Sequence, residues 1–87
     1  MLKSGVQAIK LPKSIEDVYA EVYKCSNGYL NVRLNRKWGY IDGEGNEITP
    51  LKYDTPADFN EDGKALVRRD RQFFYIDEAG NEHEVWF

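Results

Sequence analysis

The stretch "LNVRLNRKWGYIDGEGNE", residues 30–47, decides the fold because two strand patterns meet in it across a short polar break. Apolar and polar residues alternate on both sides of Asn35-Arg36, as they do in strands buried on one face. Asparagine tolerates the left-handed backbone of a two-residue type I′ turn, so we expect a hairpin tip there. Gly45 stands where a type I turn with a G1 bulge needs glycine, so a third strand should follow.

The same pattern returns 35 residues later, since residues 27–47 align without a gap on residues 62–82 with ten identities in 21 positions. Asp70-Arg71 replaces the first tip, and Gly80 replaces Gly45. The sequence therefore predicts a mainly β fold, an antiparallel meander built from two three-stranded repeats of about 35 residues. The expected strands span roughly 28–34, 37–42 and 46–49, and then roughly 63–69, 72–77 and 81–86.

The length of 87 residues fits one domain near the lower limit of what folds on its own core. We expect a single domain over 1–87, with a flexible N-terminus over 1–8. The first repeat should cover 9–47 and the second 48–87.

Residues 14–25, "SIEDVYAEVYKC", fit two structures. Their apolar residues have helical spacing behind a Ser14–Asp17 capping box, which would give a short N-terminal helix. They also alternate as in a strand, and Pro56 in the corresponding later segment opposes a helix. We favour the strand slightly.

The turn register assigns side chains to two faces of each repeat. We expect one face to be aliphatic core, and it carries Leu30, Val32, Leu34, Gly39 and Ile41, and in the second repeat Ala65, Val67, Phe74 and Ile76. The opposite face carries cross-strand pairs of arginine with an aromatic ring, Arg33 with Trp38 and Arg68 with Phe73, beside Tyr40 and Tyr75. Such pairs are cation–π arrangements.

Gly39 interrupts the first strand pattern where the second repeat has Phe74. Glycine in a strand usually marks a bulge or the close approach of another group. We expect Phe74, or another aromatic ring of the chain, to pack over Gly39.

Composition excludes several classes of partner. The net charge of −3, with both signs interspersed, disfavours nucleic acid. The sequence has no apolar stretch of the length of a membrane span and no signal-peptide pattern at its start, so we expect no membrane partner. Cys25, the single cysteine, cannot form an intramolecular disulfide, and a cytoplasmic location is the default expectation.

No catalytic constellation is evident, so we expect no enzyme, no cofactor and no metal site. His83, the single histidine, lies in an alternating strand near the end, and Cys25 lacks a basic cluster that would lower its pKa. The segment "DGEGNE", residues 42–47, resembles a calcium loop only superficially and fits a turn better. Glu82 and Glu84 are expected at a solvated sheet edge.

The face with arginine and aromatic side chains is the candidate binding site. It is either a second layer of core, covered by residues 9–25 and 53–59, or an exposed patch of the kind enriched at protein interfaces. The candidate binding residues are Arg33, Trp38, Tyr40, Arg68, Phe73, Tyr75 and the near-terminal Trp86.

These residues make the chain resemble the bacterial WG-repeat family, tandem β-repeats named for a Trp-Gly pair. The residues that carry the resemblance are Lys37-Trp38-Gly39-Tyr40-Ile41-Asp42, Gly45, Glu47-Ile48, Pro50, Tyr53-Asp54 and Phe59. The second copy departs from the pattern, with Phe73-Phe74 in place of Trp-Gly. The resemblance implies about two repeat units and a binding or scaffolding module.

We therefore expect a non-enzymatic protein-interaction module, such as a small regulator or inhibitor of another protein. The alternative is a carbohydrate-binding module that stacks sugars on Trp38, Tyr40 and Tyr75. An enzyme would need a deep pocket that holds His83 and a carboxylate. A homodimer through unclosed repeat edges is a further expectation.

Overall fold

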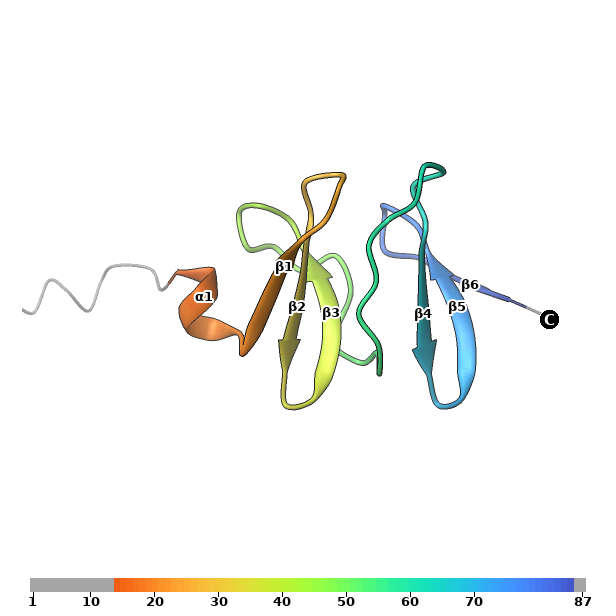
Figure 1. Cartoon of the computed structure of the whole chain (residues 1–87), viewed down its shortest axis with the longest axis horizontal. Coiled ribbons are helices and arrows are strands. Elements are labelled where there is room, and N and C mark those ends of the chain that lie inside the picture. The colour runs from red at the N-terminus through yellow and green to blue at the C-terminus, as the bar shows by residue number, and fades with distance from the viewer. Residues whose placement is uncertain (1–13, 86–87) are drawn as a thin grey trace, which may run out of the picture.

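The computed structural model describes residues 14–85, which form two three-stranded antiparallel sheets and one short helix (Figure 1). The elements are α1 (Ile15–Val18), β1 (Glu21–Lys24), β2 (Leu30–Leu34), β3 (Lys37–Ile41), β4 (Ala65–Arg69), β5 (Gln72–Ile76) and β6 (Glu82–Glu84). The strand order is β1-β2-β3 in the first sheet and β4-β5-β6 in the second. The mainly β prediction is confirmed, and the expected flexible segment 1–8 lies outside the described residues.

The predicted turns are present in both repeats. Both residues of each hairpin tip have positive φ angles, 55° and 69° at Asn35 and Arg36 and 54° and 69° at Asp70 and Arg71. This is the backbone of a type I′ turn. Gly45 and Gly80, at φ 93° and 89°, occupy the bulge positions that follow β3 and β5.

The third strand of the first sheet precedes the hairpin instead of following it. β1 pairs with β2, and Val22 lies opposite Val32. Residues 46–49, which we predicted to be a strand, make only an isolated bridge from Glu47 to Ile41. Proline cannot donate a ladder hydrogen bond, and after Pro50 the next bridge to β3 is the isolated one between Tyr53 and Trp38.

The ambiguous segment 14–25 contains both predicted structures, α1 followed by β1. Ser14 Oγ donates to the Asp17 carboxylate at 3.0 Å but caps no backbone amide, so the expected capping box forms only in part. The helix is short because Tyr19 already has an extended backbone.

The second sheet follows the prediction more closely, and β4, β5 and β6 lie inside the three expected ranges. Along β4, residues 54–60 run where β1 runs in the first sheet. The Asp54 amide donates to Arg68 O at 2.8 Å, and the Asn60 amide donates to Lys64 O at 2.8 Å. Pro56 lies between these two bonds, and the segment forms no regular strand.

The two sheets stack in the same orientation along the molecule (Figure 1). The Trp38 and Tyr40 face of the first sheet packs on the aliphatic face of the second. The buried cluster comprises Cys25, Trp38, Tyr40, Tyr53, Phe59, Ala65, Val67, Phe74 and Ile76. The aromatic face of the first sheet is therefore core, and its cover is mainly the second sheet together with Tyr53 and Phe59.

The aliphatic face of the first sheet is also buried, as predicted, at Val32 and Ile41. Leu34 is an exception, because it lies beside the hairpin tip and remains 38% exposed. α1 lies on this side of the sheet, where Ile15 and Leu30 line one cavity. None of the helices in residues 14–85 is long and apolar enough to cross a membrane.

Gly39 makes room for backbone and not for an aromatic ring, so this part of the prediction was wrong. A Cβ atom at Gly39 would lie 2.8 Å from Pro50 O and 3.1 Å from Leu51 Cα. Phe74 packs between the sheets instead. The reason is the common orientation of the sheets, which turns the Phe74 face toward the first sheet and the Gly39 face away from the second.

Candidate functional site

The structure separates six of the seven predicted binding residues into two groups. Trp38 and Tyr40 are buried between the sheets, and Arg33 is half-buried beside them. Arg68, Phe73 and Tyr75 lie on the far side of the second sheet. Trp86 lies outside the described residues. The prediction of carbohydrate binding would now rest on Tyr75, because the rings of Trp38 and Tyr40 are covered.

Trp38 has an exposed aromatic neighbour, Tyr23, which was not among the candidate binding residues. The Tyr23 ring stacks on the Trp38 ring with centroids 5.6 Å apart and planes 17° from parallel. Tyr23 is 55% exposed, whereas Trp38 is 7% exposed. The Arg33 guanidinium lies 5.8 Å from the Trp38 ring centre and forms an ion pair with Glu21. The strand alternation of residues 21–24 was the available signal for Tyr23.

The buried polar groups of the first sheet hold the linker, residues 42–64, in place. Tyr40 Oη donates to Ala57 O at 2.7 Å, and burial raises the pKa of this phenol. Asn31 Nδ2 donates to Gly39 O at 2.8 Å, and the Ala57 amide donates to Asn31 Oδ1 at 3.1 Å. Since these groups are satisfied within the chain, they serve the fold and are not available to a ligand.

The far side of the second sheet is the part of the predicted face that remains exposed. We call it the outer face, and by register it comprises Leu66, Arg68, Phe73, Tyr75, His83 and Val85. Leu66 is 39% and Phe73 36% exposed. The Arg68 guanidinium lies 5.8 Å from the Phe73 ring centre, which repeats the Arg33–Trp38 arrangement. In the first sheet the equivalent face is covered by the second sheet.

His83 pairs with a carboxylate on this surface. Its Nε2 lies 2.9 Å from Asp77 Oδ2, and the imidazole is exposed. The hydrogen bond with His83, followed by backbone amides of the turn, lowers the pKa of Asp77 to about 2. Neither of the two cavities described next includes this pair.

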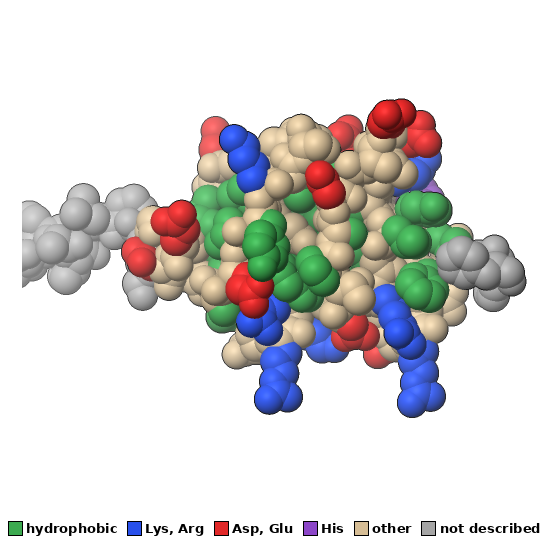
Figure 2. All heavy atoms as spheres, viewed as in Figure 1, with side chains coloured by type: hydrophobic (Ala, Val, Ile, Leu, Met, Phe, Trp, Pro, Cys, Tyr) green, Lys and Arg blue, Asp and Glu red, His purple; other side chains and the backbone are tan. Residues whose placement is uncertain are grey.

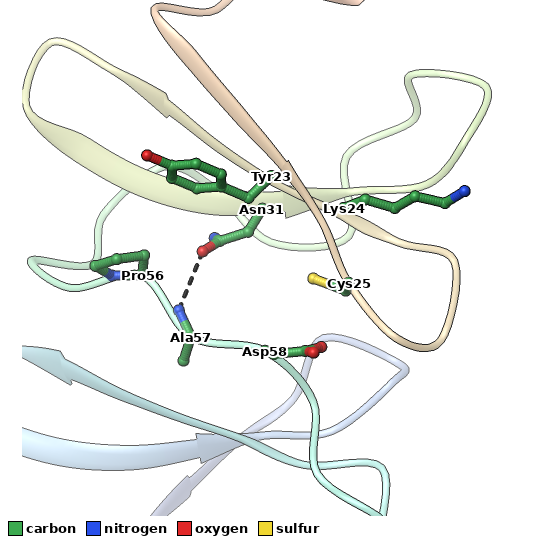
Figure 3. Close-up of a pocket in the computed structure, with 7 residues that line it drawn as sticks. All are labelled: Tyr23, Lys24, Cys25, Asn31, Pro56, Ala57 and Asp58. Atoms are coloured by element: carbon green, nitrogen blue, oxygen red, sulfur yellow. Dashed lines mark hydrogen bonds between the residues drawn. The ribbon is translucent and has the colours of Figure 1, made fainter.

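Two cavities flank β1, one on each face of the first sheet. The first, of about 260 Å³, is lined by Tyr23, Lys24, Cys25, Asn31, Pro56, Ala57 and Asp58 (Figure 3). The second, of about 340 Å³, is lined by Ser14, Ile15, Glu16, Val22, Lys24 and Leu30.

Cys25 lines the first cavity as a protonated thiol. It is buried, and burial together with the nearby Asp58 carboxylate raises its pKa to about 11. The thiolate is the nucleophilic form of cysteine. Cys25 therefore contributes an apolar wall to the cavity.

The segment resembling a calcium loop is a turn whose carboxylate is already engaged. Asp42 Oδ1 accepts hydrogen bonds from the amides of Glu44 and Asn46, both at 2.9 Å. Asn46 Nδ2 donates to Asp42 Oδ2 at 3.0 Å. These bonds, led by those from Asn46, lower the pKa of Asp42.

Glu82 is not the solvated edge residue that we expected. Its carboxylate accepts from Tyr53 Oη at 2.7 Å and from Arg69 Nη2 at 3.1 Å, and Lys52 Nζ lies 3.3 Å away. Partial burial opposes its ionisation, but the hydrogen bonds from Arg69, Tyr53 and Lys52 outweigh it and lower the pKa. Glu82 thus ties the linker to the second sheet. Its position in a strand gave no sign of this.

Comparison with known protein families gives one match. The model described as "WG containing repeat" matches residues 38–71, and neither the curated proteins nor the solved structures gave a match. The matched stretch begins in β3 with Trp38, runs through the linker and ends at the second hairpin tip. It therefore spans the junction between the sheets, where Trp38 is buried and Gly39 lets the linker pass. The chain contains a repeat of the WG family.

Proposed function

We propose that this protein is a non-enzymatic protein-interaction module that binds its partner through the outer face of the second sheet. One observation carries the proposal. The equivalent face of the first sheet binds another β-sheet within the chain, whereas the outer face leaves Leu66 and Phe73 more than one third exposed. Aromatic residues and arginine are enriched at the centres of protein interfaces. A module that binds its partner without catalysing a reaction would act as a regulator or inhibitor of that partner.

The internal contact indicates what kind of surface the partner should present. Within the chain, the surface that packs on the aromatic face of the first sheet is aliphatic and aromatic, and it is formed by Ala65, Val67, Phe74 and Ile76. Arg33 of the first sheet pairs with Glu21, whereas Arg68 makes no ion pair within residues 14–85. We therefore expect an apolar partner surface with an acidic side chain that meets Arg68.

Partner capture with two matched variants tests this function. Leu66→Asp places a charge on the outer face, and Leu34→Asp places one on β2, away from it; the wild-type leucines are 39% and 38% exposed. Proteins captured from a lysate of the source organism are identified, purified and titrated against each chain. We expect Leu66→Asp to weaken binding at least tenfold and Leu34→Asp to leave it unchanged. Equal binding by both variants, or no saturable partner, would contradict the proposal.

A further inference from the structure

The outer edge of β1 offers unpaired backbone groups. The Cys25 amide donates to Tyr29 O at 2.8 Å, so these two residues form a hydrogen-bonded pair. Hydrogen-bonded and non-hydrogen-bonded pairs alternate along an antiparallel ladder. Lys24 opposite Leu30, and Val22 opposite Val32, therefore direct their N–H and C=O groups away from β2. Within residues 14–85 no hydrogen bond reaches these outward groups.

The two cavities lie on opposite faces of the sheet at this same edge. The first lies on the side of the Tyr23 and Cys25 side chains, and the second on the side of Val22 and Leu30. Lys24 lines both. Successive side chains of an extended peptide point to opposite faces of a sheet. A strand paired with β1 would therefore place one side chain in each cavity.

The cavity walls indicate which side chains fit. The Tyr23 ring and Pro56 stand at one end of the first cavity, and Cys25 and Asp58 at the other (Figure 3). Ile15 and Leu30 supply apolar walls to the second. The first cavity, at about 260 Å³, is smaller than typical small-molecule sites, and the second, at about 340 Å³, is near the lower end of their range. Each is suited to one apolar side chain.

The charges around the edge favour a basic ligand. Asp58 lies at the first cavity and Glu16 at the second, whereas Lys24 is the one cation among the lining residues of either. Hydrogen bonds from the amide and hydroxyl of Ser26 lower the pKa of Asp58, so it is ionised at neutral pH. Figure 2 shows hydrophobic side chains gathered across the middle of the visible face, with acidic and basic side chains beside them.

We propose that β1 is a docking edge for an extended basic peptide, which adds a strand to the first sheet and places two neighbouring apolar side chains in the two cavities. Main-chain hydrogen bonds would supply affinity and the cavities would supply specificity. The chain uses a related contact at the opposite edge of this sheet, where Trp38 in β3 exchanges backbone hydrogen bonds with Tyr53 at 2.8 and 3.0 Å. The proposal does not depend on the outer face.

Two variants at Lys24 isolate the backbone contribution. Lys24→Pro removes the outward amide hydrogen, and proline is tolerated at an edge whose N–H faces solvent. Lys24→Ala removes the same side chain and keeps that hydrogen. Eight-residue random peptides displayed on phage are selected on the wild type, and the enriched peptides are synthesised and titrated against both variants by calorimetry.

We expect enriched peptides with two adjacent apolar residues flanked by lysine or arginine. Their affinity should fall at least tenfold with Lys24→Pro and less than threefold with Lys24→Ala. If Lys24→Pro does not fold, the peptide itself provides the test. Only every second backbone amide of the bound peptide should face β1. N-methylation of that set of amides should abolish binding, whereas N-methylation of the other set should not.

Three results would overturn the proposal: no enrichment on the wild type, equal binding by the two Lys24 variants, or equal tolerance of both methylation patterns. The Leu66→Asp variant should bind the selected peptides with the same affinity as the wild type. The outer-face function can therefore fail while the β1 edge binds peptides, and the reverse also holds.

Discussion

At the scale of single residues, the two members of the Trp-Gly pair have different structural roles on opposite faces of β3. Trp38 is buried between the sheets, and the Gly39 position faces the linker backbone. The sequence correctly indicated that Gly39 leaves space, because glycine is unusual inside a strand. It could not show that backbone fills the space, because the course of residues 50–51 is set by tertiary packing.

Gly39→Ala should lower the free energy of unfolding by about 1–3 kcal/mol, as overpacking does. The added Cβ would lie 2.8 Å from Pro50 O, and this backbone atom cannot rotate away as a side chain can. Gly43→Ala is the matched control, since nothing lies within 4 Å of its Cβ position. Urea denaturation measures both. Equal stability of the two variants would show that the linker does not cross Gly39.

Glu82→Gln should destabilise the protein by about 1.5–3 kcal/mol, the range for hydrogen bonds to charged groups. The amide would lose the ion pairs with Arg69 and Lys52 and leave the Tyr53 hydroxyl with a weaker acceptor. Glu84→Gln, at an exposed position of the same strand, is the control. If both variants unfold at the same urea concentration, Glu82 is no more than a surface carboxylate.

Asp77 should make stability depend on pH in the acid range. Its pKa of about 2 lies below the ordinary value of 3.8, so folding favours the carboxylate. This contribution is fully present above about pH 5 and is lost as the pH falls through 3.8 toward 2. Asp77→Asn should therefore be less stable than the wild type at pH 6, and the difference should shrink by pH 2. Thermal unfolding at both pH values measures it, and a constant difference would refute the account.

At the scale of elements, local turn chemistry was predictable and the choice of edge strand was not. The two hairpin tips and the two glycine bulges follow from residue types at fixed spacing. β1 pairs with β2 at one edge of the first sheet, whereas residues 46–49 make only an isolated bridge to β3 at the other edge. Which segments pair with the hairpin as regular strands depends on contacts between distant residues, which periodicity does not encode.

Arg36→Gly should stabilise the first hairpin by about 0.5–1 kcal/mol. Arg36 has φ 69°, a conformation that costs an ordinary side chain energy and suits glycine. Lys64→Gly, at a position without positive φ, should be neutral or destabilising. Urea denaturation distinguishes them. A loss of stability with Arg36→Gly would mean that the tip is not a type I′ turn.

At the scale of the whole molecule, the stacking of the sheets determines which predicted site residues can bind a partner. The sequence identified the face with arginine and aromatic residues in both repeats but could not show that the second sheet covers the first copy. Local patterns assign residues to faces, and only the packing of one sheet on another decides which faces remain exposed. The exposed Tyr23 and the role of Glu82 were missed for the same reason.

Shared packing should also make the two sheets unfold together. Ile76 is fully buried in the common cluster, and Ile76→Ala should cost about 2–5 kcal/mol. With Trp86→Phe in both proteins, the transitions reported by circular dichroism and by Trp38 fluorescence should shift equally and stay coincident. A Trp38 transition that does not shift would mean that the first sheet is stable without the second.

The burial of Trp38 between the sheets is the central claim, and fluorescence quenching tests it most directly. Trp86→Phe leaves Trp38 as the single tryptophan. With its side chain 7% exposed, we expect blue-shifted emission and acrylamide quenching several-fold weaker than that of N-acetyltryptophanamide. Quenching as strong as that of the free compound would place Trp38 in solvent and contradict the stacked arrangement.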